Sequence, residues 1–108
     1  MAKKTISKEL MQKIDEYVDV LRKDKLPIKK VIIFGSYAKG TSHKWSDIDL
    51  CIVSPKFLDS FSAMQYLMKK TIFNMKYTIE PIGFNLKDFS EGSSLIDEIK
   101  KTGIEIKI

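Results

Sequence analysis

The chain has 108 residues, of which 44% are apolar and 31% charged, and this balance excludes a disordered segment. We expect one globular domain, residues 1–108, with a single hydrophobic core. No apolar run approaches the roughly 18 residues of a membrane span, so no membrane partner is expected. The N-terminal lysines precede no apolar stretch, which argues against a signal peptide, and a single cysteine suits a reducing compartment. Together these features predict a cytoplasmic protein.

The formal net charge is +5, from 19 basic and 14 acidic side chains, and Arg22 is the single arginine. Specific readout of bases and phosphates tends to favour the planar fork of arginine. The lysines lie in scattered pairs without interleaved aromatic residues, which is typical of a solvated surface. Nucleic acid is therefore not expected as a direct substrate, although the excess charge favours an anionic ligand or an acidic partner.

The first half of the chain predicts one helix and two strands. Apolar residues recur at helical spacing over residues 7–24, with Ser7 as the N-cap. A short apolar run, Val31 to Phe34, indicates a buried strand. After a polar loop, Ile48 to Val53 indicates a second strand that ends near Pro55.

The second half predicts a helix over 59–73, a strand over 77–84, a helix over 94–102 and a strand over 104–108. The expected apolar face of the first of these helices consists of Phe61, Met64, Leu67, Met68 and Ile72. We expect Met64, Met68 and Met75 in the core; the alternative is an exposed surface that docks a partner helix. The order of elements predicts an α/β (α+β) fold, a small mixed sheet of about four strands with helices packed on it.

Asp47 and Asp49 stand at the start of the second predicted strand. Residues two apart on a strand point to the same face, and their Cα atoms lie roughly 6.5 Å apart. Two such carboxylates repel each other unless a positive charge lies between them. Mg²⁺ prefers oxygen ligands and often binds through one or two carboxylates plus substrate phosphates. Either acid alone is also typical of a turn or a cap.

Gly35 and Ser36 follow the first predicted strand. Glycine lets the backbone approach a ligand closely, and the serine hydroxyl and following amides can donate to phosphate oxygens. If residues 36–40 begin a helical turn, its dipole adds to the attraction. No Walker or Rossmann glycine pattern is present, and a Gly-Ser pair after a strand is also common in plain loops.

Glu80 lies inside the third predicted strand. By alternation it shares a face with Thr78, Ile82 and Phe84, so its carboxylate needs a compensating charge, which a metal at the two aspartates would supply. Pro81 cannot donate to a strand ladder, so this strand is expected at an edge or bulged. Alone, Glu80 is more typical of an exposed acid on an edge strand; the three features in this order favour a shared site.

Gly35-Ser36, ten further residues and then Asp47-Ile-Asp49 resembles the signature of the nucleotidyltransferase superfamily related to DNA polymerase beta. The chain is most similar to the minimal nucleotidyltransferases (MNT), small proteins often paired with HEPN-domain partners. The specific segments are Phe34-Gly-Ser-Tyr-Ala-Lys-Gly40 and Ser46-Asp-Ile-Asp-Leu50, and the similarity continues through Ile79-Glu-Pro81 and Gly103-Ile-Glu-Ile106.

The resemblance implies a nucleotidyltransferase fold and a role for each residue of the site. Asp47 and Asp49 would hold Mg²⁺, as two ions, and the phosphates of ATP, while Gly35 and Ser36 would hold the triphosphate. Glu80 would stand at the third carboxylate, which binds metal and activates the acceptor hydroxyl. Family members more often carry aspartate there, so the role of Glu80 is the least secure.

The resemblance also implies a protein adenylyltransferase that acts as a type VII-like antitoxin. It would transfer AMP from ATP to a tyrosine hydroxyl of a cognate HEPN ribonuclease toxin, in a hetero-oligomer with that partner. Two alternatives remain open. One is a catalytically silent antitoxin that neutralises the HEPN protein by contact, and the other is a subunit of a small-molecule, antibiotic-type nucleotidyltransferase.

Several further residues have a plain interpretation and a functional one. His43 and Trp45 are expected in an exposed loop, with nucleotide contact as the alternative. Lys39 and Lys44 are more typical of a solvated surface than of phosphate contacts. Cys51 is expected to be a small core residue.

Overall fold

The computed structural model describes residues 6–41, 47–71 and 79–108. In chain order its elements are α1 (Lys8–Lys23), β1 (Lys30–Phe34), α2 (Gly35–Lys39), β2 (Ile48–Val53), α3 (Ser60–Lys69), β3 (Ile79–Phe84), α4 (Leu86–Glu91), α5 (Ser94–Thr102) and β4 (Ile104–Ile106). No helix among the described residues is long and apolar enough to cross a membrane.

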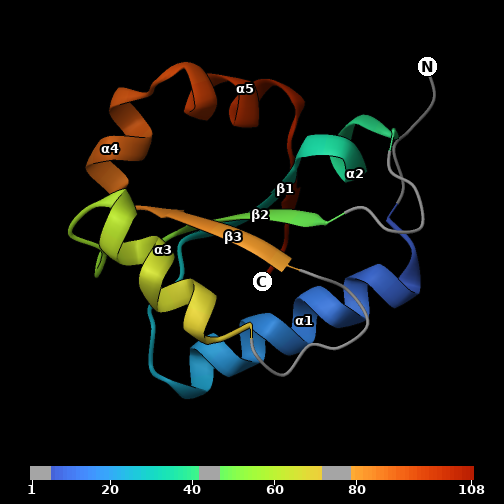
Figure 1. The fold of residues 1–108 in the computed structure, drawn as a ribbon, viewed down its shortest axis with the longest axis horizontal. Coiled ribbons are helices and arrows are strands. Elements are labelled where there is room, and N and C mark those ends of the chain that lie inside the picture. The colour runs from blue at the N-terminus through green and yellow to red at the C-terminus, as the bar shows by residue number, and fades with distance from the viewer. Residues whose placement is uncertain (1–5, 42–46, 72–78) are drawn as a thin grey trace.

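The strands form one mixed sheet with the order β3-β2-β1-β4 (Figure 1). β1 pairs antiparallel with both β2 and β4, whereas β2 and β3 run parallel. Parallel neighbours need a crossover connection, and α3 lies in it. The mixed four-stranded sheet confirms the predicted fold class. β3 is an edge strand, as Pro81 predicted.

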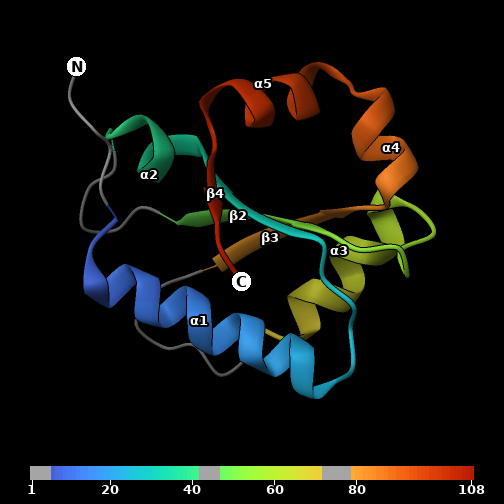
Figure 2. The same ribbon diagram turned by 180° about the vertical axis from the view of Figure 1, so that it is seen from behind.

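Helices cover both faces of the sheet, as the two opposite views show (Figures 1 and 2). One face packs against α1 and α3, in a cluster that includes Ile14, Leu21, Ile48, Leu50, Ile52 and Leu67. The other packs with α4 and α5, in a cluster that includes Ile32, Cys51, Val53, Phe89, Ile96 and Ile99. Each fully buried side chain of this size stabilises the fold by about 1.5–3 kcal/mol. The alternation along β2 therefore fixes which face each of its residues serves.

Polar side chains cap the starts of α1, α3, α4 and α5, and the cap at Ser7 was predicted from the sequence. The Ser7 hydroxyl accepts a hydrogen bond from the Leu10 amide at 3.1 Å, as expected for the N-cap of α1. Asp59, Asn85 and Ser93 cap α3, α4 and α5 in the same way. α4 was not predicted, because its six residues carry too few apolar positions for a helical period to show. β4 ends at Ile106, two residues earlier than the alternation suggested.

The predicted apolar face of α3 is wrong in part. Phe61, Met64 and Met68 are exposed, and the helix contacts the sheet through Ala63 and Leu67. The reason is a close approach at Gly83 of β3, where a Cβ would lie 2.8 Å from Ala63 Cβ and 3.0 Å from Leu67 Cδ1. A contact this close requires a small side chain at its centre, and Ala63 provides it. Ile72, Met75, Tyr77 and Thr78 lie outside the described residues.

Replacement of Gly83 by alanine tests this close approach. The added methyl would also meet the Phe57 ring at 2.7 Å, so α3 must shift from the sheet. We expect a loss of about 1–3 kcal/mol in the free energy of unfolding, measured by urea titration. An Ala63→Gly change in the same chain should recover part of the loss. A Gly83→Ala variant as stable as the parent would contradict the tight α3–β3 contact.

Candidate active site

Two parallel strands bring three carboxylates together. β2 and β3 begin at the same end of the sheet, and Asp49 stands opposite Glu80 in their register. Asp47 immediately precedes β2, and Glu80 is hydrogen-bonded to both aspartates. The three acids predicted from sequence thus share one cluster, although 31 residues separate Asp49 from Glu80 along the chain.

The cluster carries unfavourable charge. The hydrogen bond with Asp47, partial burial and the charges of both aspartates raise the pKa of Glu80. Partial burial raises the pKa of Asp49, and the nearby charge of Asp47 adds to this effect. Ionisation of all three groups is therefore costly, so the cluster favours either a retained proton or a bound cation.

Gly35 places the Gly-Ser segment directly against Asp49. Its φ is +71°, a left-handed conformation that favours glycine. A Cβ at this position would lie 2.1 Å from Asp49 Oδ2, so no other residue fits without displacing the carboxylate. Phe34, the residue before the turn, stands opposite Asp49 in the β1–β2 register. The predicted phosphate-binding segment and the predicted metal-binding acid are therefore in contact.

The turn predicted at residues 36–40 is the short helix α2, which begins at Gly35. The N-cap residue of α2, Phe34, makes no side-chain hydrogen bond to the helix. The first amides of α2 therefore receive no hydrogen bond acceptor from the cap residue. Ala38, on the inner side of α2, is fully buried. Gly40 ends the helix with a φ of +76°. Ser36 thus lies in the first turn of α2, directly after the Gly35 that contacts Asp49.

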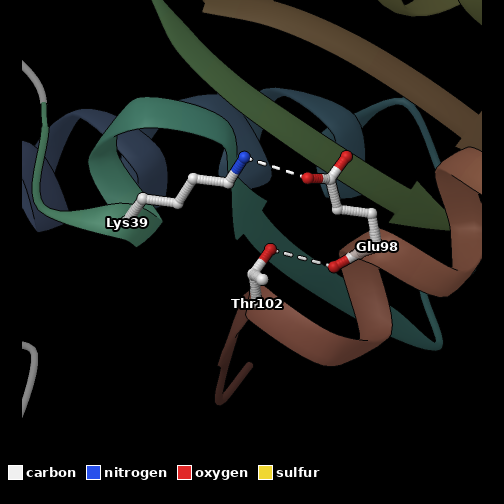
Figure 3. Close-up of polar contacts among 3 residues, drawn as sticks. All are labelled: Lys39, Glu98 and Thr102. Atoms are coloured by element: carbon white, nitrogen blue, oxygen red, sulfur yellow. Dashed lines mark hydrogen bonds and ion pairs between the residues drawn. The ribbon is translucent and has the colours of Figure 1, made fainter.

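Lys39 ties α2 to α5 (Figure 3). Its Nζ lies 2.9 Å from Glu98 Oε1, and the Thr102 hydroxyl donates to the Glu98 carbonyl oxygen at 2.9 Å. An exposed pair of this kind stabilises a fold by about 0–1 kcal/mol, so it steadies α2 only modestly. Lys39, expected on a solvated surface, is exposed in this pair. Glu98 was missed because it lies 59 residues away from Lys39 and no local pattern joins them.

Of the remaining candidate residues, the structure describes Cys51 alone. Cys51 is fully buried in the second core cluster, and burial raises the pKa of its thiol to about 12, as suits the predicted core role. His43, Lys44 and Trp45 lie outside the described residues.

The carboxylate cluster fits a divalent cation by its chemistry. Three carboxylates share one location, and the missing side chain of Gly35 leaves room for one of them, that of Asp49. No group of three or more acidic, histidine or cysteine side chains in residues 6–41, 47–71 and 79–108 is arranged as a ready metal cage. The three carboxylates are hydrogen-bonded to one another instead, and a bound cation would have to replace these hydrogen bonds.

Asp49→Asn tests the electrostatic cost of the cluster. Folding raises the pKa of Asp49. Its contribution to the free energy of unfolding is therefore fully present below the pKa that Asp49 has in the unfolded chain, and it is lost as the pH rises through the pKa in the folded protein. Without divalent cations we expect the asparagine variant to unfold at a higher temperature than the parent at pH 7, with the difference shrinking towards pH 4. Asp19→Asn, on the exposed face of α1, is the control. A less stable Asp49→Asn protein at pH 7 would contradict the charge repulsion.

Comparison with known proteins identifies the family. Residues 14–106 match the nucleotidyltransferase domain family. MJ0141 of Methanocaldococcus jannaschii, whose name assigns it to the protein adenylyltransferases, is 31% identical over 91% of this chain and 96% of its own length. The protein adenylyltransferase MntA of Shewanella oneidensis is 33% identical over 55% of this chain and 44% of its own length.

A solved structure agrees with these relatives. A crystal structure of a toxin–antitoxin complex with AMP-PNP contains a chain that superposes with a TM-score of 0.60 at 25% identity. The superposition covers 87% of this chain and 69% of that one. These matches confirm the resemblance read from the Gly-Ser and Asp-x-Asp motifs. The chain belongs to the nucleotidyltransferase domain family and is a nucleotidyltransferase.

Proposed function

We propose that this nucleotidyltransferase is an antitoxin that transfers AMP from ATP to a tyrosine hydroxyl of a cognate HEPN ribonuclease toxin. One observation carries the proposal: Asp47, Asp49 and Glu80 meet beside Gly35, where no Cβ fits. The similarity to proteins named protein adenylyltransferase and to a toxin–antitoxin chain crystallised with AMP-PNP supports the protein substrate and the donor.

In this proposal Asp47, Asp49 and Glu80 hold Mg²⁺, as two ions. When bound, Mg²⁺ supplies charge neutralisation for the phosphates of ATP as the α-phosphorus is attacked. The Ser36 hydroxyl and the first amides of α2 donate hydrogen bonds to the phosphate oxygens. Gly35 keeps the backbone close enough for both sets of contacts.

Glu80 is the proposed proton acceptor. The acceptor oxygen forms a bond to the α-phosphorus, the bond from the α-phosphorus to the bridging oxygen breaks, and pyrophosphate leaves. The hydroxyl proton passes to the Glu80 carboxylate, whose pKa the neighbouring acids already raise. Glu80 lies on the edge strand β3 and is exposed, so an acceptor from a second protein can reach it.

The acceptor belongs to another chain in this account. We treat residues 1–108 as a single minimal domain, which forms a hetero-oligomer with the toxin. A catalytically silent antitoxin is the second candidate, but the intact site argues against it, since a decayed site has no need to keep acids in contact at an electrostatic cost. A small-molecule transferase subunit is the third, and it requires a helical partner that shapes the substrate pocket.

An AMP-transfer assay tests the proposal. The protein is incubated with labelled ATP, Mg²⁺ and the product of the neighbouring gene, the candidate HEPN protein. We expect label on the HEPN protein, none with the Asp47→Ala, Asp49→Ala double variant or with excess chelator, and a rate lowered by about 10²–10⁴-fold with Glu80→Gln. Asp19→Asn is the control and should act as the parent. Neutralisation of the toxin by parent and double variant alike, without label, would establish the silent antitoxin instead.

A further inference from the structure

A second concave feature lies away from the carboxylates. A cavity of about 300 Å³ opens between the C-terminal end of α1 and the beginning of α3. Its floor is apolar and consists of the buried side chains of Leu26, Phe57 and Ala63. Lys25 and Lys56 line it as well. The cavity thus combines an apolar floor with two cationic side chains.

The cavity and the active site lie at opposite ends of the sheet. β2 starts beside Asp47 and leads, through Val53, to Lys56 and Phe57 at the cavity. The strand from Asp49 to Val53 alone spans roughly 13 Å. In both views α2 lies at one side of the molecule, and α3 with the end of α1 lies towards the other (Figures 1 and 2). A ligand of the cavity would leave the carboxylates free.

Two large apolar side chains stand in solvent beside the cavity. Leu58 is 86% exposed and lines the cavity, and Phe61, in the first turn of α3, is 65% exposed. Their segment is held in place: Asn85 Nδ2 donates to the Leu58 carbonyl oxygen at 3.1 Å, and Asp59 caps α3 through the Ser62 amide at 2.7 Å. The fold therefore presents these side chains outward, and clustered exposed apolar groups mark interaction surfaces.

The charge of the cavity favours an acidic ligand. Among the described residues Lys25 and Lys56 form no ion pair. The one acid that lines the cavity, Asp24, is already occupied, because it accepts a hydrogen bond from the Tyr66 hydroxyl and lies 3.5 Å from Lys70 Nζ. Its negative charge is therefore largely compensated, and the two lysines dominate.

We propose that Leu58, Phe61 and this cavity form a docking surface for an acidic segment of the acceptor protein that carries a bulky apolar side chain. The apolar side chain fills the floor between Leu26 and Phe57, and flanking carboxylates pair with Lys25 and Lys56. Leu58 and Phe61 extend the apolar area beyond the cavity, which suits a polypeptide and exceeds what a small molecule would cover. The inference rests on the proposed function, since it assumes that the acceptor is a protein.

Docking at this distance has a kinetic consequence. A tethered acceptor reaches the carboxylates at a raised effective concentration, while the chemistry at Glu80 stays the same. Loss of docking should therefore raise the KM for the acceptor protein and leave kcat and the KM for ATP unchanged.

Two independent variants test the surface. Leu58→Ser with Phe61→Ser removes the apolar part, and Lys25→Glu with Lys56→Glu reverses the charge. The matched controls are Leu95→Ser, 44% exposed on α5, and Lys107→Glu, exposed after β4. Far-ultraviolet circular dichroism and thermal unfolding confirm that each protein folds. The acceptor used is the candidate HEPN protein of the transfer assay, and its Kd is measured by calorimetry without ATP.

We expect each double variant to raise the Kd and the KM of the HEPN protein at least tenfold, with kcat within twofold of the parent and both controls unchanged. Binding to the parent should weaken with added salt, and the charge-reversed variant should lose this salt dependence. Unchanged Kd and KM in both double variants, with AMP still transferred, would overturn the docking surface alone. Binding by the parent that the variants lose, without AMP transfer, would support the surface and overturn the proposed activity. A parent protein that neither binds the HEPN protein nor transfers AMP to it would overturn both.

Discussion

The absence of one Cβ atom governs the site. Gly35 turns the chain from β1 into α2 with a left-handed backbone, and the Asp49 carboxylate lies where a side chain would begin. This contact joins the segment suited to phosphate with the acids suited to metal. The carboxylates repel each other, yet they stay together because the pairing of β2 with β3 sets the positions of Asp49 and Glu80. The sheet supplies the free energy that the charges oppose.

Parallel pairing is the second constraint. Because β2 and β3 run in the same direction, their first residues meet at one edge, and the crossover through α3 carries the chain back to make this possible. The same geometry sends the far ends of both strands to the other side of the molecule. There the chain builds a surface with different chemistry, apolar and cationic, around Leu58 and Lys56. One sheet thus separates the proposed active site from the proposed docking surface.

Local sequence patterns predicted most of this arrangement. Ser7, the apolar run before Gly35 and the alternation around Asp49 each depend on neighbours in the chain, so period and caps were enough to place them. Glu80 was placed beside the aspartates because a carboxylate among apolar neighbours needs a compensating charge, and the family match confirmed the resemblance that the motif indicated. The contacts that escaped prediction are long-range. The close approach at Gly83 determines which side of α3 is buried, and Glu98 pairs with Lys39. Neither contact can be predicted from the residues adjacent in the chain.

The central claim is that Asp47, Asp49, Glu80 and the Gly35-Ser36 turn form one site for metal and nucleotide. A crystal structure with Mn²⁺ and AMP-PNP, with data collected for the anomalous signal of manganese, tests it most directly. The account predicts manganese bound by oxygens of Asp47, Asp49 and Glu80, with the phosphates of the analogue at Ser36 and the first amides of α2. Manganese and nucleotide bound elsewhere, with the three carboxylates still bonded to one another, would contradict it.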